Sequence, residues 1–195
     1  MRRRARFFFG AALFLISIAS LESALVTGRI YAVNFVDVDG NHLSTSAGRI
    51  TVLVLTTSTD TGKARAVGDR IPDFCLANPR YRMITVLNLT GKYSGFKRTF
   101  GTWLIRQRLN SEAKRLQQRY SVRKIQRDAR RDVFAVADFD GTIISQLGAK
   151  PEASEFHVFV FGADGKLLRQ WNDVPSASEL QAALNVGGTP PVSSH

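Results

Sequence analysis

Apolar residues along this chain fall into short runs that are separated by turn-forming pairs such as Asp-Gly and Asn-Pro. The run ITVLVLTT at 50–57 is unbroken and rich in β-branched residues, which predicts a strand buried on both faces of a sheet. Alternating apolar and polar residues before Asp39-Gly40 predict a hairpin. Further strands are predicted in three apolar stretches, within 82–89, 133–138 and 155–171.

Two segments have features of capped helices. Apolar residues at helical spacing within 64–71 predict a first helix, which Ser58 or Thr59 is expected to cap. Ser176 and Glu179 have the spacing of a capping box and predict a last helix. Strands that alternate with helices, followed by a hairpin and a helix, predict an α/β sandwich around a mixed sheet.

The first residues have the pattern of an export signal. Arginines within 2–6 precede FFFGAALFLISIASL at 7–21, an apolar run shorter than the roughly 20 residues that cross a bilayer. We therefore expect 1–25 to be a cleaved signal peptide or an uncleaved signal anchor, with the protein exported to the bacterial periplasm or held on the extracytoplasmic face of the membrane. The domain is expected at 26–186, followed by a disordered tail at 187–195.

The net charge of +11 comes from the segment 92–131, which holds thirteen Lys and Arg residues against two acidic residues. Apolar residues at i, i+4, i+7 and i+11 from Leu109 to Tyr120 predict a long helix. Its cations are either simply solvated or form a face that binds an anionic membrane surface or an acidic protein. Nucleic acid is not an expected partner, because no base-reading motif occurs. The candidate binding face comprises Arg106, Arg108, Lys114, Arg115, Arg119, Arg123, Lys124 and Arg127.

The sequence DFDGT at 138–142 is similar to the nucleophile motif of haloacid-dehalogenase phosphatases. That similarity implies Asp138 as nucleophile and Asp140 as acid and base beside Mg²⁺. However, an Asp-Gly pair ends a strand three times in this chain, and Asp-Gly is a common turn. Only 53 residues follow Thr142, and they contain no adjacent acidic pair for the metal. A Mg²⁺-dependent phosphatase therefore stays an alternative to a non-catalytic protein.

Two stretches resemble the thioredoxin-like superfamily. VDVDGNHLSTSAGRITVLVLTTSTDTGKAR at 36–65 resembles the opening of redoxin-type folds, in which an Asp-Gly hairpin and a loop precede a buried strand leading to the cysteine motif. HVFVFGADGKLLRQWNDVPSASELQAAL at 157–184 resembles the closing strand, turn, strand and helix. The order of parts is most similar to the periplasmic YtfJ-type branch. The resemblance implies a thioredoxin-like α/β sandwich with a mixed central sheet, here with a long basic helical insert at 92–131.

The redox residues of that superfamily are missing. With Gly48 aligned to the redoxin glycine, Asp60 and Lys63 stand near the positions of the two active cysteines. The facing cis-proline should come just before the strand at 157, where this chain has 153–155, and Pro151 lies too early. Because thiol–disulfide exchange requires a thiolate, the resemblance without a CxxC motif implies a redox-inactive binding or scaffold module.

The single cysteine, Cys75, excludes an internal disulfide. We interpret it as a small buried apolar side chain, with a residual thiol-linked redox role as the alternative. No cofactor or metal is expected. Polar residues at the vacated redox site either bind an anion at the helix N-terminus or merely cap the helix; they are Thr57, Ser58, Thr59, Asp60, Thr61 and Lys63.

Overall fold

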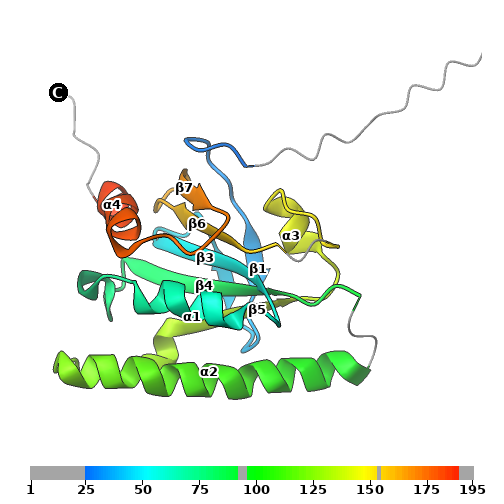
Figure 1. Ribbon diagram of the computed structural model, residues 1–195, viewed down its shortest axis with the longest axis horizontal. Helices are drawn as coiled ribbons and strands as arrows, with labels where there is room; N and C mark the ends of the chain where they lie inside the picture. Colours follow the sequence, from blue (N-terminus) through cyan, green and yellow to red (C-terminus); the bar gives the residue numbers. More distant parts are fainter. Residues whose placement is uncertain (1–24, 92–95, 153–154, 189–195) are drawn as a thin grey trace, which may run out of the picture.

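The computed structural model describes residues 25–91, 96–152 and 155–188, and its centre is a five-stranded mixed sheet (Figure 1). The strands lie in the order β5-β4-β3-β6-β7. β3, β4 and β5 are parallel, whereas β6 is antiparallel to β3 and β7 is antiparallel to β6. The bounds are β3 Ile50–Thr57, β4 Tyr81–Asn88, β5 Val133–Asp138, β6 His157–Phe161 and β7 Leu167–Trp171.

The apolar run at 50–57 forms β3, the central strand, and all eight of its residues are buried. Successive side chains along a strand point to opposite faces of the sheet. Val52 and Val54 therefore join the core on one face, and Leu53 and Leu55 join the core on the other. The predicted strand buried on both faces and the predicted mixed sheet are confirmed.

A separate two-stranded hairpin, β1 (Asn34–Val36) and β2 (His42–Ser44), precedes the central sheet. It confirms the turn predicted at Asp39-Gly40, where Gly40 has a φ of 89°, a left-handed conformation that glycine adopts without a steric penalty. The carboxylate of Asp37 accepts the backbone N–H of Asp39 at 2.9 Å. Polar residues thus bond within the turn while the hairpin packs its apolar side on the sheet.

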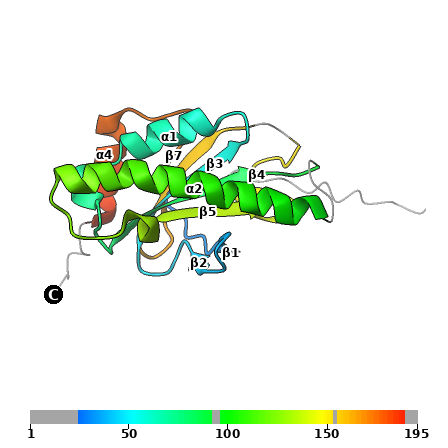
Figure 2. The ribbon, with the colours of Figure 1, turned by 90° about the horizontal axis from the view of Figure 1, so that it is seen from below.

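Helices cover both faces of the sheet. Helices α1, α2 and α4 contribute to the cores on one face, and α3 and the hairpin contribute to the core on the other. Figure 2 shows α2 extending across the molecule beside α1, with β5 next to it. The bounds are α1 Thr61–Asp69, α2 Phe96–Val122, α3 Thr142–Gln146 and α4 Ala177–Gly188, with short 3-10 helices η1 Asp73–Cys75 and η2 Ala129–Asp132.

The two predicted helix caps have different outcomes. The cap at Ser58 or Thr59 is wrong, because α1 begins at Thr61 with Asp60 as its N-cap residue and has no side-chain capping bond. The capping box before α4 is confirmed. Ser176 N–H donates to Glu179 Oε2 at 2.8 Å, and Glu179 N–H donates to Ser176 Oγ at 3.2 Å.

The predicted signal segment lies outside the described residues apart from residue 25. Of the tail predicted at 187–195, residues 187 and 188 belong to α4, and the rest lies outside the described residues. In the described ranges, no helix has both the length and the apolar character needed to cross a bilayer.

Candidate functional site

The residues predicted at the vacated redox site, 57–61 and Lys63, lie where β3 ends and α1 begins. The Thr57 hydroxyl lies 2.7 Å from the Thr59 hydroxyl and donates to Asp60 Oδ2 at 3.1 Å. Lys63 Nζ lies 3.2 Å from a carboxylate oxygen of Asp173. The structure gathers the six residues at the start of α1, where Thr57, Thr59 and Asp60 bond to one another and Lys63 pairs with the distant Asp173.

Cys75 lies in η1, beyond the carboxyl end of α1, and is therefore far along the chain from the tip where a redox thiol is expected. Its side chain is free and buried, which confirms the interpretation as a small core residue. Burial raises the pKa of the thiol to about 12. Because the thiolate is the nucleophile, this position suppresses thiol chemistry near neutral pH.

The carboxyl ends of the parallel strands bring Thr57, Asn88 and Asp138 into neighbouring register positions. Asp138 is buried, and its two carboxylate oxygens accept backbone N–H groups from Gly141 at 3.0 Å and Ile144 at 2.9 Å. The carboxylate thus links the end of β5 to α3. Sequence reasoning missed Asn88, whose only signal is its place at the end of an apolar strand.

The second motif aspartate, Asp140, is exposed and accepts the Thr142 N–H at 3.0 Å. Burial raises the pKa of Asp138, whereas hydrogen bonds from Thr142 lower the pKa of Asp140. Gly141 has a φ of 79°, and a Cβ there would lie 2.7 Å from Pro151. Among the described residues, no group of three His, Cys, Asp or Glu side chains could hold a metal ion. The DFDGT loop has the contacts of a packed turn.

The candidate basic face, which lies on α2 and in the loop after it, divides into two sets. Arg119 donates to the Gly68 carbonyl at 2.9 Å and to the Ile71 carbonyl at 2.8 Å, and Arg115 pairs with Asp69 at 3.2 Å. These bonds hold α2 against the carboxyl end of α1, where free carbonyls and cations attract each other. The residues with partners inside the protein are Arg106, Arg115, Arg119, Arg123 and Arg127.

The other three, Arg108, Lys114 and Lys124, are exposed and form no ion pair with any carboxylate in the described part of the chain. The amino-terminal half of α2 also exposes Phe100 and Trp103, 54% and 50% accessible, whose stacked rings lie 5.7 Å apart. Sequence reasoning missed these aromatic residues. The sequence pattern that could have found them is the i, i+3, i+4 spacing of Phe100, Trp103 and Leu104, which places these apolar residues on the side of the helix opposite Leu109.

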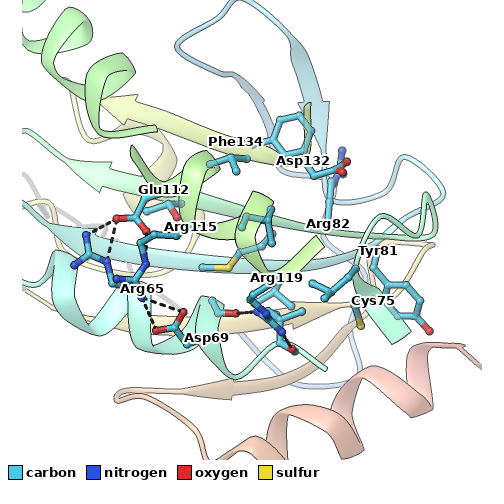
Figure 3. A pocket seen from close by; sticks show the side chains of 18 of the residues that line it. Arg65, Asp69, Cys75, Tyr81, Arg82, Glu112, Arg115, Arg119, Asp132 and Phe134 are labelled. Atoms are coloured by element: carbon cyan, nitrogen blue, oxygen red, sulfur yellow. Dashed lines mark hydrogen bonds and ion pairs between the residues drawn. The ribbon is translucent and has the colours of Figure 1, made fainter. Parts of the chain in front are cut away.

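A cavity of about 1080 Å³ lies between α1, α2 and the sheet (Figure 3). Arg65 pairs with Glu112 and Arg115 with Asp69 at one end of the view, whereas Cys75 and Tyr81 lie at the other. The apolar residues that line it include Val52, Met83, Leu87, Ile105, Leu109 and Leu116.

The strand order and the flanking helices match known structures. A chain classed as a protein disulfide isomerase from Bacteroides thetaiotaomicron has a TM-score of 0.52 and 10% identity, covering 83% of this chain and 88% of that one. A chain classed as a thioredoxin from Neisseria meningitidis has a TM-score of 0.51 and 10% identity, covering 87% and 95%. This protein has a thioredoxin-like fold.

The predicted thioredoxin-like fold is thus confirmed, and its single cysteine fits the absence of a CxxC motif. A chain classed as an electron transport protein from Aquifex aeolicus is similar at a TM-score of 0.50 and 13% identity, covering 84% of this chain and 99% of that one. No protein-family model matches the sequence, and no curated protein matches it. Identities this low establish the fold and not an activity.

Proposed function

We propose that this thioredoxin-fold protein is exported and non-catalytic, and that the outer face of α2 binds an anionic membrane surface. The observation that supports this most is the stacked Phe100–Trp103 pair, which is exposed on the helix that also carries Arg108 and Lys114. Lys124 follows in the turn after the helix, and none of the three cations has an acidic partner in the described residues. Leu104, 39% exposed, extends the apolar patch.

The combination of aromatic and cationic side chains favours a lipid surface over an acidic protein as the partner. Trp and Phe residues insert at the level of the headgroups, and each Lys or Arg near an anionic surface contributes about 1 kcal/mol. An acidic protein would satisfy the cations Arg108, Lys114 and Lys124, but it would give Trp103 no apolar environment.

Export and membrane proximity rest on the sequence at the amino terminus. The arginines in 2–6 and the apolar run at 7–21 have the order of an export signal, with the charges on the cytoplasmic side. If that segment stays as an anchor, it holds the domain close to the bilayer. Because the anchor would raise the local concentration of the domain at the membrane, even a weak affinity of the α2 face for lipid would be enough for binding.

A non-catalytic role agrees with the chemistry of the site. The start of α1 carries Asp60 and Lys63 where the resemblance places cysteines, and neither can exchange a disulfide. The only thiol, Cys75, is buried with a raised pKa. We therefore assign the protein a role in binding through its surface.

The test uses the fluorescence of Trp103 in the full-length protein. A Trp171→Phe background leaves Trp103 as the only tryptophan, because the chain has two. Vesicles containing phosphatidylglycerol should shift its emission to shorter wavelength, and vesicles of phosphatidylcholine alone should not. The shift should fade near ~0.5 M salt, where the screening length is a few ångströms.

Variants with fewer charges distinguish binding through this face from a nonspecific effect of the protein's net positive charge. Lys114→Gln combined with Lys124→Gln should weaken vesicle binding roughly 30-fold, from about 1 kcal/mol per cation. The matched control, Lys166→Gln combined with Arg169→Gln, removes the same charge from exposed positions around β7, at the opposite edge of the sheet from β5. An equal loss in both double variants, or no shift of Trp103 on anionic vesicles, would overturn the proposal.

A further inference from the structure

The cavity between α1 and α2 exposes part of an internal strand. β4 lies between β3 and β5, yet Met83 and Thr85, whose side chains face the helices, are only half-buried. Every residue of the neighbouring β3 is buried. The two helices are therefore held apart over β4, and the strand forms the floor of a long trough.

Both walls of this trough contribute apolar residues. Helix α1 contributes Ala64 and Gly68, and helix α2 contributes Leu109 and Leu116. Gly68 widens the trough, because a Cβ built there would meet nothing nearer than Met83 Sδ at 3.7 Å. A larger residue at this position would point its side chain toward the floor.

Ion pairs close the trough at its surface. Arg65 bonds to Glu112 through two nitrogens, and Arg115 lies 3.2 Å from Asp69. All four side chains are a third or more exposed to solvent. Exposed pairs of this kind add little to stability, so they can separate and admit a ligand at small cost.

The shape of the cavity selects an elongated ligand. Its lining on α2 extends from Ile105 to Val122, which is about 26 Å at 1.5 Å per residue. Its volume of about 1080 Å³ reaches the upper end of ligand pockets, which hold drug-sized molecules at roughly 300–1,000 Å³. A long, narrow apolar site fits an acyl chain better than a compact ring system.

The charge of the lining selects an anion. Eight arginines and four carboxylates line the cavity, and Arg108 is a lining residue without a carboxylate partner in the described ranges. We propose that the trough binds a long-chain fatty acid, with its acyl chain over Met83 and Leu109 and its carboxylate at Arg108. Lys114 and Lys124, the two cations changed in the vesicle experiment, do not line the cavity, so the two proposals are tested separately.

Binding is measured with cis-parinaric acid, a fluorescent fatty acid, added to the full-length protein without vesicles and below the concentration at which the acid forms micelles. Wild-type protein should enhance its fluorescence, and oleic acid should displace it. Oleyl alcohol, which has the same chain without the charge, should displace it at least tenfold less well. Arg108→Gln should remove that preference for the acid, because a charge-assisted hydrogen bond is lost.

A matched pair of glycine variants tests the location. Gly68→Leu fills the trough and should reduce affinity more than tenfold, whereas Gly62→Leu, at an exposed position of the same helix with no neighbour within 4 Å, should not change it. Both changes improve helix propensity, so α1 should still form. Equal affinity in both variants would overturn the proposal.

A measurement on the wild-type protein tests the proposal without relying on variants that fail to fold. Cys75 lines the same cavity but reacts slowly because its pKa is raised, so its modification is followed over hours with excess maleimide at constant pH. Saturating oleic acid should slow this modification at least fivefold. Labelling at the same rate with and without oleic acid, or equal displacement by acid and alcohol, would show that the cavity does not hold a fatty acid.

Discussion

The hydroxyl of Tyr120 donates a hydrogen bond to Asp132 Oδ2 at 2.8 Å and accepts the backbone N–H of Ala77 at 3.0 Å. This side chain is 1% exposed and lies near the end of α2. It therefore joins three segments that are distant in sequence: the loop after η1, the helix and η2. Ala77 has a φ of 55°, a conformation that non-glycine residues adopt only when neighbours hold them there.

Tyr120→Phe should lower the free energy of unfolding by about 1–3 kcal/mol, because the Ala77 N–H and the Asp132 carboxylate each lose a partner. Urea denaturation followed by circular dichroism measures the change. Tyr31→Phe is the control, since that hydroxyl serves one exposed backbone N–H. A loss no larger than the control's would show that the three segments are held together by packing alone.

Arg119→Gln and Arg108→Gln should differ although they remove the same charge from the same helix. Arg119 bonds to the Gly68 and Ile71 carbonyls, so its loss should cost about 1–3 kcal/mol of stability. Arg108→Gln should stay within ~0.5 kcal/mol of wild type, as is usual for unpaired surface residues. Equal unfolding midpoints for the two variants would contradict the division of these cations into those bonded inside the protein and those without an acidic partner.

Cys75 should make the free energy of unfolding depend on pH under alkaline conditions. Its pKa is raised from 9.0 to about 12 in the folded protein, so the folded state retains a proton that the unfolded chain releases. The contribution of the buried thiol is complete below about pH 9 and falls as pH rises toward 12, by at most about 1.4 kcal/mol per pH unit. The stability advantage of wild type over Cys75→Ala, measured by urea titration, should therefore shrink between ~pH 8 and ~pH 10.5.

Asp138→Asn should destabilise the protein by about 1–3 kcal/mol, because an amide nitrogen would then face the N–H of Gly141 or Ile144. Asp140→Asn should have little effect, since that side chain is exposed. Hydrolysis of p-nitrophenyl phosphate with Mg²⁺ is assayed in parallel. Turnover by wild type that disappears in Asp138→Asn would restore the phosphatase alternative.

Local patterns predicted those elements whose bonds lie within a few residues. The capping box of Ser176 and Glu179 forms as its spacing indicates. Gly40, Gly141 and Gly165 all have positive φ at the predicted Asp-Gly turns. Such features depend on backbone bonds between near neighbours, which a single sequence displays.

The cap before α1 was predicted wrongly for a related reason. Ser58 and Thr59 are good capping types, but Thr59 instead pairs with the Thr57 hydroxyl, which also bonds to Asp60. The side chains of Thr57, Thr59 and Asp60 bond to one another, and none of them caps a backbone N–H of α1. Propensity alone could not predict this, because it depends on how β3 enters the turn.

The sequence by itself determined the central buried strand, the mixed α/β architecture and the concentration of charge between 92 and 131, because these follow from the order of apolar and charged residues. Only the tertiary structure decided which of those cations are available. Arg119 reaches carbonyls at 68 and 71 while Lys114 faces solvent, and this depends on where α1 and α2 lie over β4. Ion pairs and cavities form between segments distant along the chain, and no local pattern encodes the distance between them.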